Sequence, residues 1–306
     1  MKIYDNILQT IGKTPVLKLN SINIKNNVTI LAKLEYFNPT SSVKDRIALN
    51  MINKAEKEGL LKPGATIVEP TSGNTGLGLA MVAAARGYKL IITMPETMSI
   101  ERRHLLRHLG ADILLTPGET GMTGAVQKAE EILKNTPGAF MPAQFSNPAN
   151  PESHYTTTAP EIWEDTDGLF DIFTAAVGTG GTLIGCGKFF KEKNKKILIA
   201  AVEPANSAIL SGKTPGKHSI QGIGAGFIPE IIDKNLIDKV ITVNDSDAFQ
   251  TSKMLAEKEG ILCGISSGAN VYAALKLAEK PENKNKTIVT VICDTGERYL
   301  STDLFI

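Results

Sequence analysis

The sequence of 306 residues is poor in cysteine and has no excess of charge of either sign. Its three cysteines, Cys186, Cys263 and Cys293, are odd in number and far apart, which argues against a disulfide framework and favours reduced core residues. Lysine and arginine number 33 and aspartate and glutamate number 32, so the formal net charge is +1. Because no local block of like charge compensates, we expect neither nucleic acid nor an anionic membrane as a partner.

Long hydrophobic runs are also missing. The longest uncharged apolar stretch, residues 77–85, stops at Arg86 and is much shorter than the roughly 18 residues of a membrane span. The first residues contain no apolar segment typical of a secretory signal, so we expect a cytoplasmic protein. What remains is an ordinary globular composition in a chain long enough for about two domains.

Apolar, β-branched runs alternate with longer helical patterns along most of the chain, which is typical of α/β domains with mostly parallel sheets flanked by helices. The pattern predicts strands over residues 29–34, 65–69, 89–94, 112–115, 171–177, 197–202, 239–243 and 287–292. It predicts helices over residues 42–58, 75–85, 99–109, 121–133, 183–192, 245–259 and 268–278. A stretch rich in proline and asparagine, residues 135–151, marks a domain junction. The long irregular stretch 207–226 is typical of a functional or mobile loop.

Two turns rich in glycine, serine and threonine each follow a strand and open a helix. Their sequences are Glu69-Pro-Thr-Ser-Gly-Asn-Thr-Gly76 and Val177-Gly-Thr-Gly-Gly-Thr182. Backbone N–H groups and the positive end of the helix dipole would let such a turn bind a phosphate or carboxylate. The same residues also make tight turns that bind nothing, so composition alone leaves both interpretations open.

The spacing of the residues in these turns limits the kinds of phosphate-containing ligand that they could bind. Neither turn has the lysine followed by serine or threonine that an ATP- or GTP-binding loop requires. The dinucleotide pattern G-x-G-x-x-G also fails, because its third position falls on Leu183 or on Phe227. Glu203, which ends a strand about one βα unit after Gly178, keeps an NAD-dependent dehydrogenase as an alternative.

Lys44 lies in the first turn of a predicted helix, within Asn38-Pro-Thr-Ser-Ser-Val-Lys-Asp-Arg46. The positive end of the helix disfavours an ammonium group, and burial would lower the pKa of the amine further, so Schiff-base or base chemistry is one interpretation. A solvated surface lysine is the other. His104 and His108 are four residues apart on a predicted helix, but their arginine neighbours indicate a solvated cationic face, and no metal site is expected.

Taken together and in order, these segments resemble the β-family of pyridoxal-phosphate enzymes (fold type II), and within it the O-acetylserine sulfhydrylases. The resemblance runs from Ile11-Gly-Lys-Thr-Pro15 through the Lys44 motif and the loop at Thr71 to Gly296-Glu-Arg-Tyr-Leu-Ser301. Between them it includes Gln144-Phe-Ser-Asn-Pro-Ala-Asn150, the turn at Gly178, Gln221-Gly-Ile-Gly-Ala-Gly-Phe227 and Gly264-Ile-Ser-Ser-Gly-Ala269. The chain departs from the usual family pattern at Cys263 and at Cys293, where proline is common, and neither position is assigned to chemistry.

The resemblance implies a role for each segment. Lys44 would be the catalytic lysine that forms the internal aldimine with pyridoxal 5'-phosphate, Asn74 would contact the phenolic oxygen of the ring, and Ser266 its pyridine nitrogen. The cofactor phosphate would be held by Gly178, Thr179, Gly180, Gly181 and Thr182. The substrate would be bound by Thr71, Ser72, Gly73, Asn74, Thr75, Gln144, Gly222, Ile223 and Gly224.

The resemblance also implies a fold and a reaction. Residues 42–148 would form a smaller, mobile domain, and residues 1–41 plus 149–306 a larger one, with the cofactor in the cleft between them. The reaction would be β-replacement of acetate in O-acetyl-L-serine by sulfide, through an α-aminoacrylate intermediate, giving L-cysteine. Cystathionine β-synthase-like and O-phosphoserine sulfhydrylase activities are alternatives within the family. The loop at Gly222 has the sulfhydrylase form, so we expect a sulfhydrylase without a haem-binding or regulatory extension.

Partners follow from the same resemblance. A homodimer is implied, as is binding of the C-terminal tail of serine acetyltransferase. Two alternative functions come from other classes. One is a non-catalytic homologue that only binds a partner peptide, and the other is the NAD-dependent dehydrogenase. The joint presence of Lys44, Asn74 and Ser266 argues against a pure binding module, because such a module needs no cofactor-binding lysine.

Overall fold

The computed structural model describes residues 3–71, 73–98 and 100–306, so Ser72, one of the predicted substrate-binding residues, lies outside the described residues. The chain divides into two compact units. The small unit comprises Met1–Ile11 and Asn38–Asn150, and the large unit comprises Gly12–Phe37 and Pro151–Ile306. The N-terminal segment groups with the small unit, whereas the sequence-based division assigned it to the larger domain; Leu8 packs into the small unit's core.

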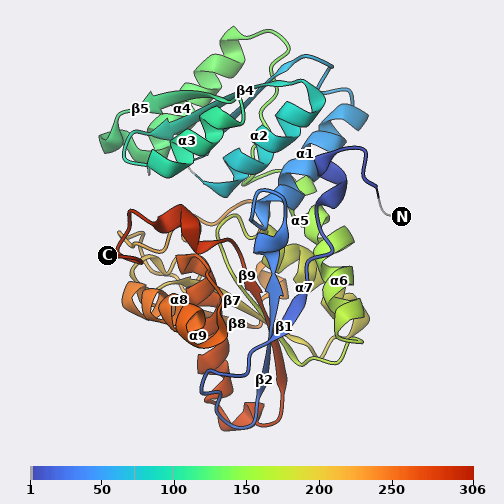
Figure 1. Ribbon diagram of the computed structural model, residues 1–306, viewed down its shortest axis with the longest axis vertical. Coiled ribbons are helices and arrows are strands. Elements are labelled where there is room, and N and C mark those ends of the chain that lie inside the picture. The colour runs from blue at the N-terminus through green and yellow to red at the C-terminus, as the bar shows by residue number, and fades with distance from the viewer. Residues whose placement is uncertain (1–2, 72, 99) are drawn as a thin grey trace. The chain divides into compact units, whose positions relative to one another are not determined.

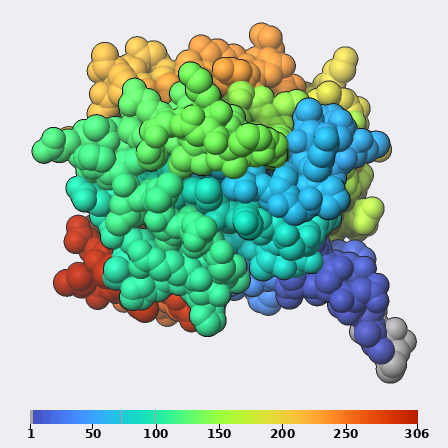
Figure 2. All heavy atoms as spheres, turned by 90° about the horizontal axis from the view of Figure 1, so that it is seen from above, coloured from blue at the N-terminus to red at the C-terminus, as the bar shows by residue number. Residues whose placement is uncertain are grey.

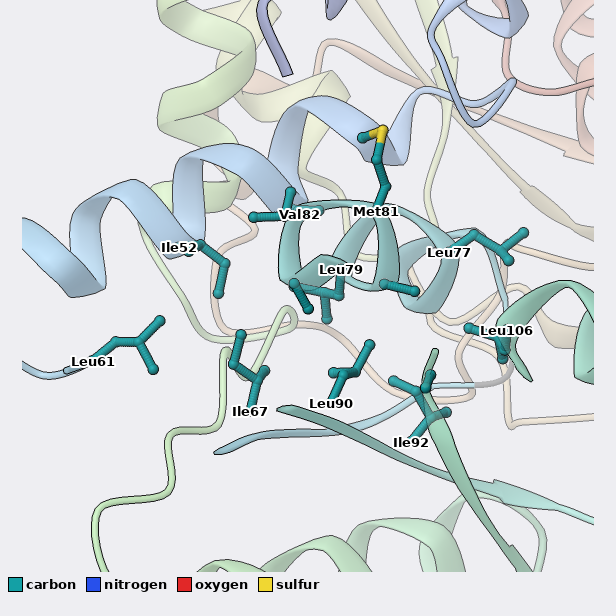
Figure 3. Packing of buried hydrophobic residues seen from close by; sticks show 14 of the residues in the cluster. Ile52, Leu61, Ile67, Leu77, Leu79, Met81, Val82, Leu90, Ile92 and Leu106 are labelled. Atoms are coloured by element: carbon teal, nitrogen blue, oxygen red, sulfur yellow. The ribbon is translucent and has the colours of Figure 1, made fainter. Parts of the chain in front are cut away.

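The small unit is built on a parallel sheet in the order β3-β4-β5 (Figure 1). The strands are β3 (Thr66–Pro70), β4 (Lys89–Pro95) and β5 (Asp112–Thr116), and the helices are α1 (Lys44–Lys57), α2 (Asn74–Arg86), α3 (Ile100–His108) and α4 (Gly121–Asn135). In Figure 3, Leu79 of α2 faces Ile67 of β3 and Leu90 of β4, and all three belong to one core cluster. The atoms of this unit are coloured from blue to green in Figure 2.

The large unit contains a six-stranded sheet in the order β1-β2-β9-β6-β7-β8, in which only the β1–β2 pairing is antiparallel. The strands are β1 (Val16–Lys18), β2 (Thr29–Leu34), β6 (Ile172–Ala176), β7 (Leu198–Pro204), β8 (Lys239–Val243) and β9 (Thr287–Ile292). Its helices are α6 (Ala159–Asp165), α7 (Gly181–Lys193), α8 (Asp245–Glu259) and α9 (Ile265–Ala278), and α5 (Ala149–Ser153) spans the passage between units. Helices α6 and α7 cover one face of the sheet, and α8 and α9 the other (Figure 1).

Every predicted strand and helix is present, with ends shifted by a few residues, which confirms the α/β class with mostly parallel sheets. Gly87 and Gly260 cap α2 and α8 in the left-handed conformation. The pattern missed β1, which has only three residues, and the helical passage from α5 to α6. No helix among the described residues has the length and hydropathy to cross a bilayer.

Candidate active site

The turn between β6 and α7 has no room for a side chain at two of its glycines. A Cβ atom on Gly178 would lie 2.3 Å from the carbonyl oxygen of Gly222, and one on Gly180 would lie 2.1 Å from Cδ1 of Ile232. Gly180 also has a φ of 90°, which favours glycine. The Gly181 N–H donates to the Thr179 hydroxyl at 3.4 Å as α7 begins. A turn that needs glycine at two positions and lies at the N-terminus of a 13-residue helix suits a phosphate group.

A histidine that the sequence patterns did not single out supports this turn. His154 is 1% exposed; its Nε2 lies 3.2 Å from Thr182 Oγ1, and its Nδ1 lies 2.8 Å from Thr158 Oγ1. His154 begins a π-helical turn, His154–Thr158, that packs closely on α7: a Cβ on Gly185 would lie 2.8 Å from His154 Cβ and 3.0 Å from the Tyr155 nitrogen. His154 therefore orients the Thr182 hydroxyl from behind.

The predicted loop at residues 222–224 lies beside the same turn. The Gly224 N–H donates to the carbonyl of Val177 at 2.9 Å, and Gly222 and Gly224 have φ values of 89° and 65°. The Ile223 side chain packs with Ile265 in one core cluster of the large unit. The structure thus places the Gly178 turn, the Gly222 loop and the start of α9 near one another.

Ser266 and Ser267 begin α9, and the structure gives them different partners. The Ser267 hydroxyl accepts the Cys293 N–H at 2.9 Å. No hydrogen bond joins the buried Ser266 hydroxyl to another described residue, so this group is available to a ligand such as a pyridine nitrogen. The Cys293 N–H that Ser267 accepts would be missing if proline stood there.

In the small unit, Lys44 is half-buried and is the first residue of α1. Its backbone N–H donates to the Ser42 hydroxyl at 3.2 Å. The first turn of α1 lies directly against α2, because a Cβ on Gly78 would lie 3.1 Å from the Lys44 carbonyl oxygen and 2.9 Å from Ala48 Cβ. Since Asn74 is the first residue of α2, the two helix starts that carry the predicted lysine and asparagine lie on neighbouring helices.

The predicted substrate residues of the small unit also come together. The Thr75 hydroxyl donates to Gln144 Oε1 at 2.7 Å, and both residues are buried. The Gly73 N–H donates to the Thr71 hydroxyl at 3.4 Å. The turn at Gln144 is in turn held by Glu69, which sequence reasoning did not assign: the carboxylate accepts the N–H groups of Ala143 and Gln144 at 2.9 and 3.1 Å. Burial raises the pKa of Glu69 to about 7, although these two hydrogen bonds oppose the shift.

Glu203, the basis of the dehydrogenase alternative, is engaged elsewhere. One carboxylate oxygen accepts the Leu210 N–H at 2.7 Å, and the other accepts the Ser211 N–H and hydroxyl at 3.0 and 2.6 Å. The residue is buried and fixes the start of the loop that leads to Gly222. A carboxylate held in this way is not available to a ribose hydroxyl, so the structure does not support that alternative.

Neither Cys263 nor the metal-ligating side chains of the described residues form a further catalytic site. Burial raises the pKa of the Cys263 thiol to about 12, so this cysteine is a core residue rather than a nucleophile. Within residues 3–71, 73–98 and 100–306, no group of three or more metal-ligating side chains is found.

The donors that are present fit pyridoxal phosphate. The large unit supplies a turn rich in glycine and threonine for the phosphate and a hydroxyl for the ring nitrogen, and the small unit supplies an amine and an amide at two adjacent helix starts. These four groups match the functional groups of the cofactor one by one.

Comparison with known proteins agrees with this donor set. The sequence model of the family described as "Pyridoxal-phosphate dependent enzyme" matches residues 7–294. Cysteine synthase A of Escherichia coli is 58% identical over 313 residues, which cover 99% of this chain and 96% of that protein. The cysteine synthase structure from Entamoeba histolytica has 51% identity and a TM-score of 0.96, covering 99% of this chain and 91% of that one. O-acetyl serine sulfhydrylase isoform 3 of the same organism has 50% identity and a TM-score of 0.95, covering 99% and 92%. With its motifs matched over nearly the whole length, the chain belongs to the family of pyridoxal-phosphate dependent enzymes.

Proposed function

We propose that the protein makes L-cysteine and acetate from O-acetyl-L-serine and sulfide. The observation that carries the proposal is the similarity of this chain, over its full length, to cysteine synthases. The glycine-rich turn, the lysine at the start of α1 and the serine at the start of α9 suit the cofactor that such an enzyme needs. In the net reaction a C–O bond to acetate breaks at the β-carbon and a C–S bond forms there. No oxidant or reductant is consumed.

The cofactor would be held by residues of both units. Gly178, Thr179, Gly180, Gly181 and Thr182 would bind its phosphate, with His154 behind Thr182. Ser266 would donate to or accept from the ring nitrogen, Asn74 would contact the phenolic oxygen, and Lys44 Nζ would bind the aldehyde carbon. Bound pyridoxal phosphate supplies a conjugated ring that stabilises negative charge at the α-carbon of an amino acid.

The remaining steps belong to the chain itself. Lys44 Nζ removes the proton from the substrate α-carbon and later returns it, so acid and base are one group. Thr71, Ser72, Gly73, Thr75 and Gln144 would bind the substrate carboxylate, and Gly222, Ile223 and Gly224 would also contact the substrate. A neutral serine hydroxyl at the ring nitrogen holds no permanent proton there, which favours prompt loss of the β-substituent.

The assembly is part of the same proposal. We propose a cytoplasmic homodimer whose active site can also bind the C-terminal tail of serine acetyltransferase. Size-exclusion chromatography with light scattering tests the dimer, and a synthetic peptide of that tail, added to the holoenzyme as a competitor of O-acetyl-L-serine, tests the docking.

Product analysis tests the activity. The holoenzyme is incubated with O-acetyl-L-serine and sulfide, and L-cysteine and acetate are quantified; we expect equal amounts of the two. Parallel reactions replace sulfide with homocysteine, or O-acetyl-L-serine with O-phospho-L-serine. Faster turnover in either of these would contradict the proposal in favour of a cystathionine β-synthase-like or O-phosphoserine-dependent activity.

A further inference from the structure

Glu69 bridges two segments that are far apart in the sequence. It lies near the end of β3, and its carboxylate accepts the backbone N–H groups of Ala143 and Gln144, which follow it by 74 and 75 positions in the sequence. The same segment pairs with β3 one step earlier, where the Phe140 carbonyl accepts the Val68 N–H at 2.9 Å and the Phe140 N–H donates to the Thr66 carbonyl at 2.9 Å. Beyond Phe140, hydrogen bonds to the Glu69 carboxylate therefore replace the backbone pairing that holds this segment against β3.

The backbone at this point needs to be held. Ala143 has a φ of 53°, which is unfavourable for a residue with a side chain. Its carbonyl accepts the N–H groups of Ser146 and Asn147, both at 3.0 Å, so the chain turns sharply there. With both carboxylate oxygens fixed on consecutive N–H groups, Glu69 stabilises this turn on its outer side.

The turn carries Gln144, and β3 leads directly into the loop at Thr71. Gln144 Oε1 accepts the Thr75 hydroxyl at 2.7 Å, and the Gln144 carbonyl accepts Asn150 Nδ2 at 2.8 Å. Glu69 therefore sets the distance between the two segments that are proposed to bind the substrate carboxylate. We propose that Glu69 is a positioning residue that fixes Gln144 against the Thr71 loop and so determines the affinity of the enzyme for the carboxylate of its amino-acid substrate.

The environment of Glu69 argues for this role over a purely structural one. Its partner across the sheet, Ile92, is apolar, and the described residues offer it no ion pair. A carboxylate that is 1% exposed and lacks a cation costs folding free energy when ionised, so an apolar side chain or an amide would suit stability alone. Only a carboxylate accepts both N–H groups, because an amide would place its own NH₂ group against one of them.

The inference rests on the proposed function, and its test separates the two. Glu69→Gln and wild-type holoenzyme are titrated with L-alanine, which has the substrate carboxylate and no β-substituent to lose, and binding is followed by the absorption of the cofactor. We expect about a tenfold weaker affinity for L-alanine and a similar rise in KM for O-acetyl-L-serine, with kcat within about twofold and an unchanged cofactor content, since one hydrogen bond is lost.

Glu56→Gln is the control, because Glu56 is another hydrogen-bonded carboxylate of the small unit but is only half-buried and lies near the far end of α1, where it binds Arg86 and Tyr88. It is expected to change neither L-alanine affinity nor KM. Glu69→Asp retracts the carboxylate by one methylene group and serves if Glu69→Gln does not fold; we expect weaker L-alanine binding again. Wild-type affinity in a folded Glu69 variant overturns the inference, and so does an equal loss in Glu56→Gln. If the wild type binds L-alanine but makes no cysteine, the proposed function fails on its own.

Discussion

Lys44 carries the proposed chemistry, and its replacement gives the sharpest test at the residue scale. Lys44→Ala removes the amine that binds the cofactor and moves the α-proton, so turnover is expected to fall by at least about 10³-fold. Lys57→Ala, at the exposed end of the same helix, is the control. Far-ultraviolet circular dichroism should be the same for both variants. A folded Lys44→Ala enzyme with wild-type turnover would refute the assignment.

Glu69 also predicts a pH dependence of stability. Because burial raises its pKa from 4.5 to about 7, the folded protein holds a proton at Glu69 that the unfolded chain releases between these values. Its contribution to the free energy of unfolding is therefore greatest below pH 4.5 and is lost as the pH rises through about 7. Relative to Glu69→Gln, the wild type should lose up to about 3 kcal/mol between pH 4.5 and 8, measured by urea unfolding of the apoprotein. Parallel stability curves for the two proteins would contradict this pKa.

The residues that the sequence did not reveal share one property. Glu69 and His154 act through contacts with residues 75 and 28 positions away, respectively. No local pattern encodes such contacts, whereas Lys44 and the turn at Gly178 stand in recognisable motifs at helix starts. A glutamate followed by proline at the end of a strand occurs at Glu69 and at Glu203, and in both places it holds the backbone of a later loop. This repeated Glu-Pro pattern is the one sequence signal that could have indicated the role of Glu69.

At the scale of elements, the start of α7 should be the most sensitive part of the large unit. Gly178→Ala would bring Cβ within 2.3 Å of the Gly222 carbonyl oxygen, so the turn must open and the dissociation constant for pyridoxal phosphate should rise at least tenfold. Gly187→Ala, on the same helix, meets only the Ile199 side chain at 3.3 Å and should bind the cofactor as the wild type does. Equal affinities for both variants, from titration of the apoproteins, would remove the turn from the phosphate site.

Most elements could be predicted because their signals are local. Buried parallel strands such as β6 and β9 are runs of mostly apolar or β-branched residues, and α8 ends at a glycine cap. The passage from residue 149 to 165 was missed because its prolines, asparagines and threonines disfavour a helix locally. Packing on α7, which Gly185 makes possible, overrides that preference. The short β1 exists only through its pairing with β2.

At the scale of the whole molecule, ligand binding and stability are coupled. Cofactor added to the apoprotein stabilises the folded state by an amount that grows with its free concentration, about 2.7 kcal/mol at one hundred times the dissociation constant. We therefore expect the Tm of the apoprotein to rise steadily with added pyridoxal phosphate. Inorganic phosphate at the same concentrations should give a much smaller rise. Identical shifts for both would mean that only the phosphate turn binds.

The visible absorption spectrum of the holoenzyme tests the central claim most directly. Bound pyridoxal phosphate gives an absorption band that should change when O-acetyl-L-serine is added without sulfide, and should return to its starting form when sulfide follows. Such a cycle would establish the cofactor, the amino-acid substrate and the sulfur acceptor step in one experiment. A protein whose spectrum does not respond to O-acetyl-L-serine, with pyridoxal phosphate fully bound, would contradict the account.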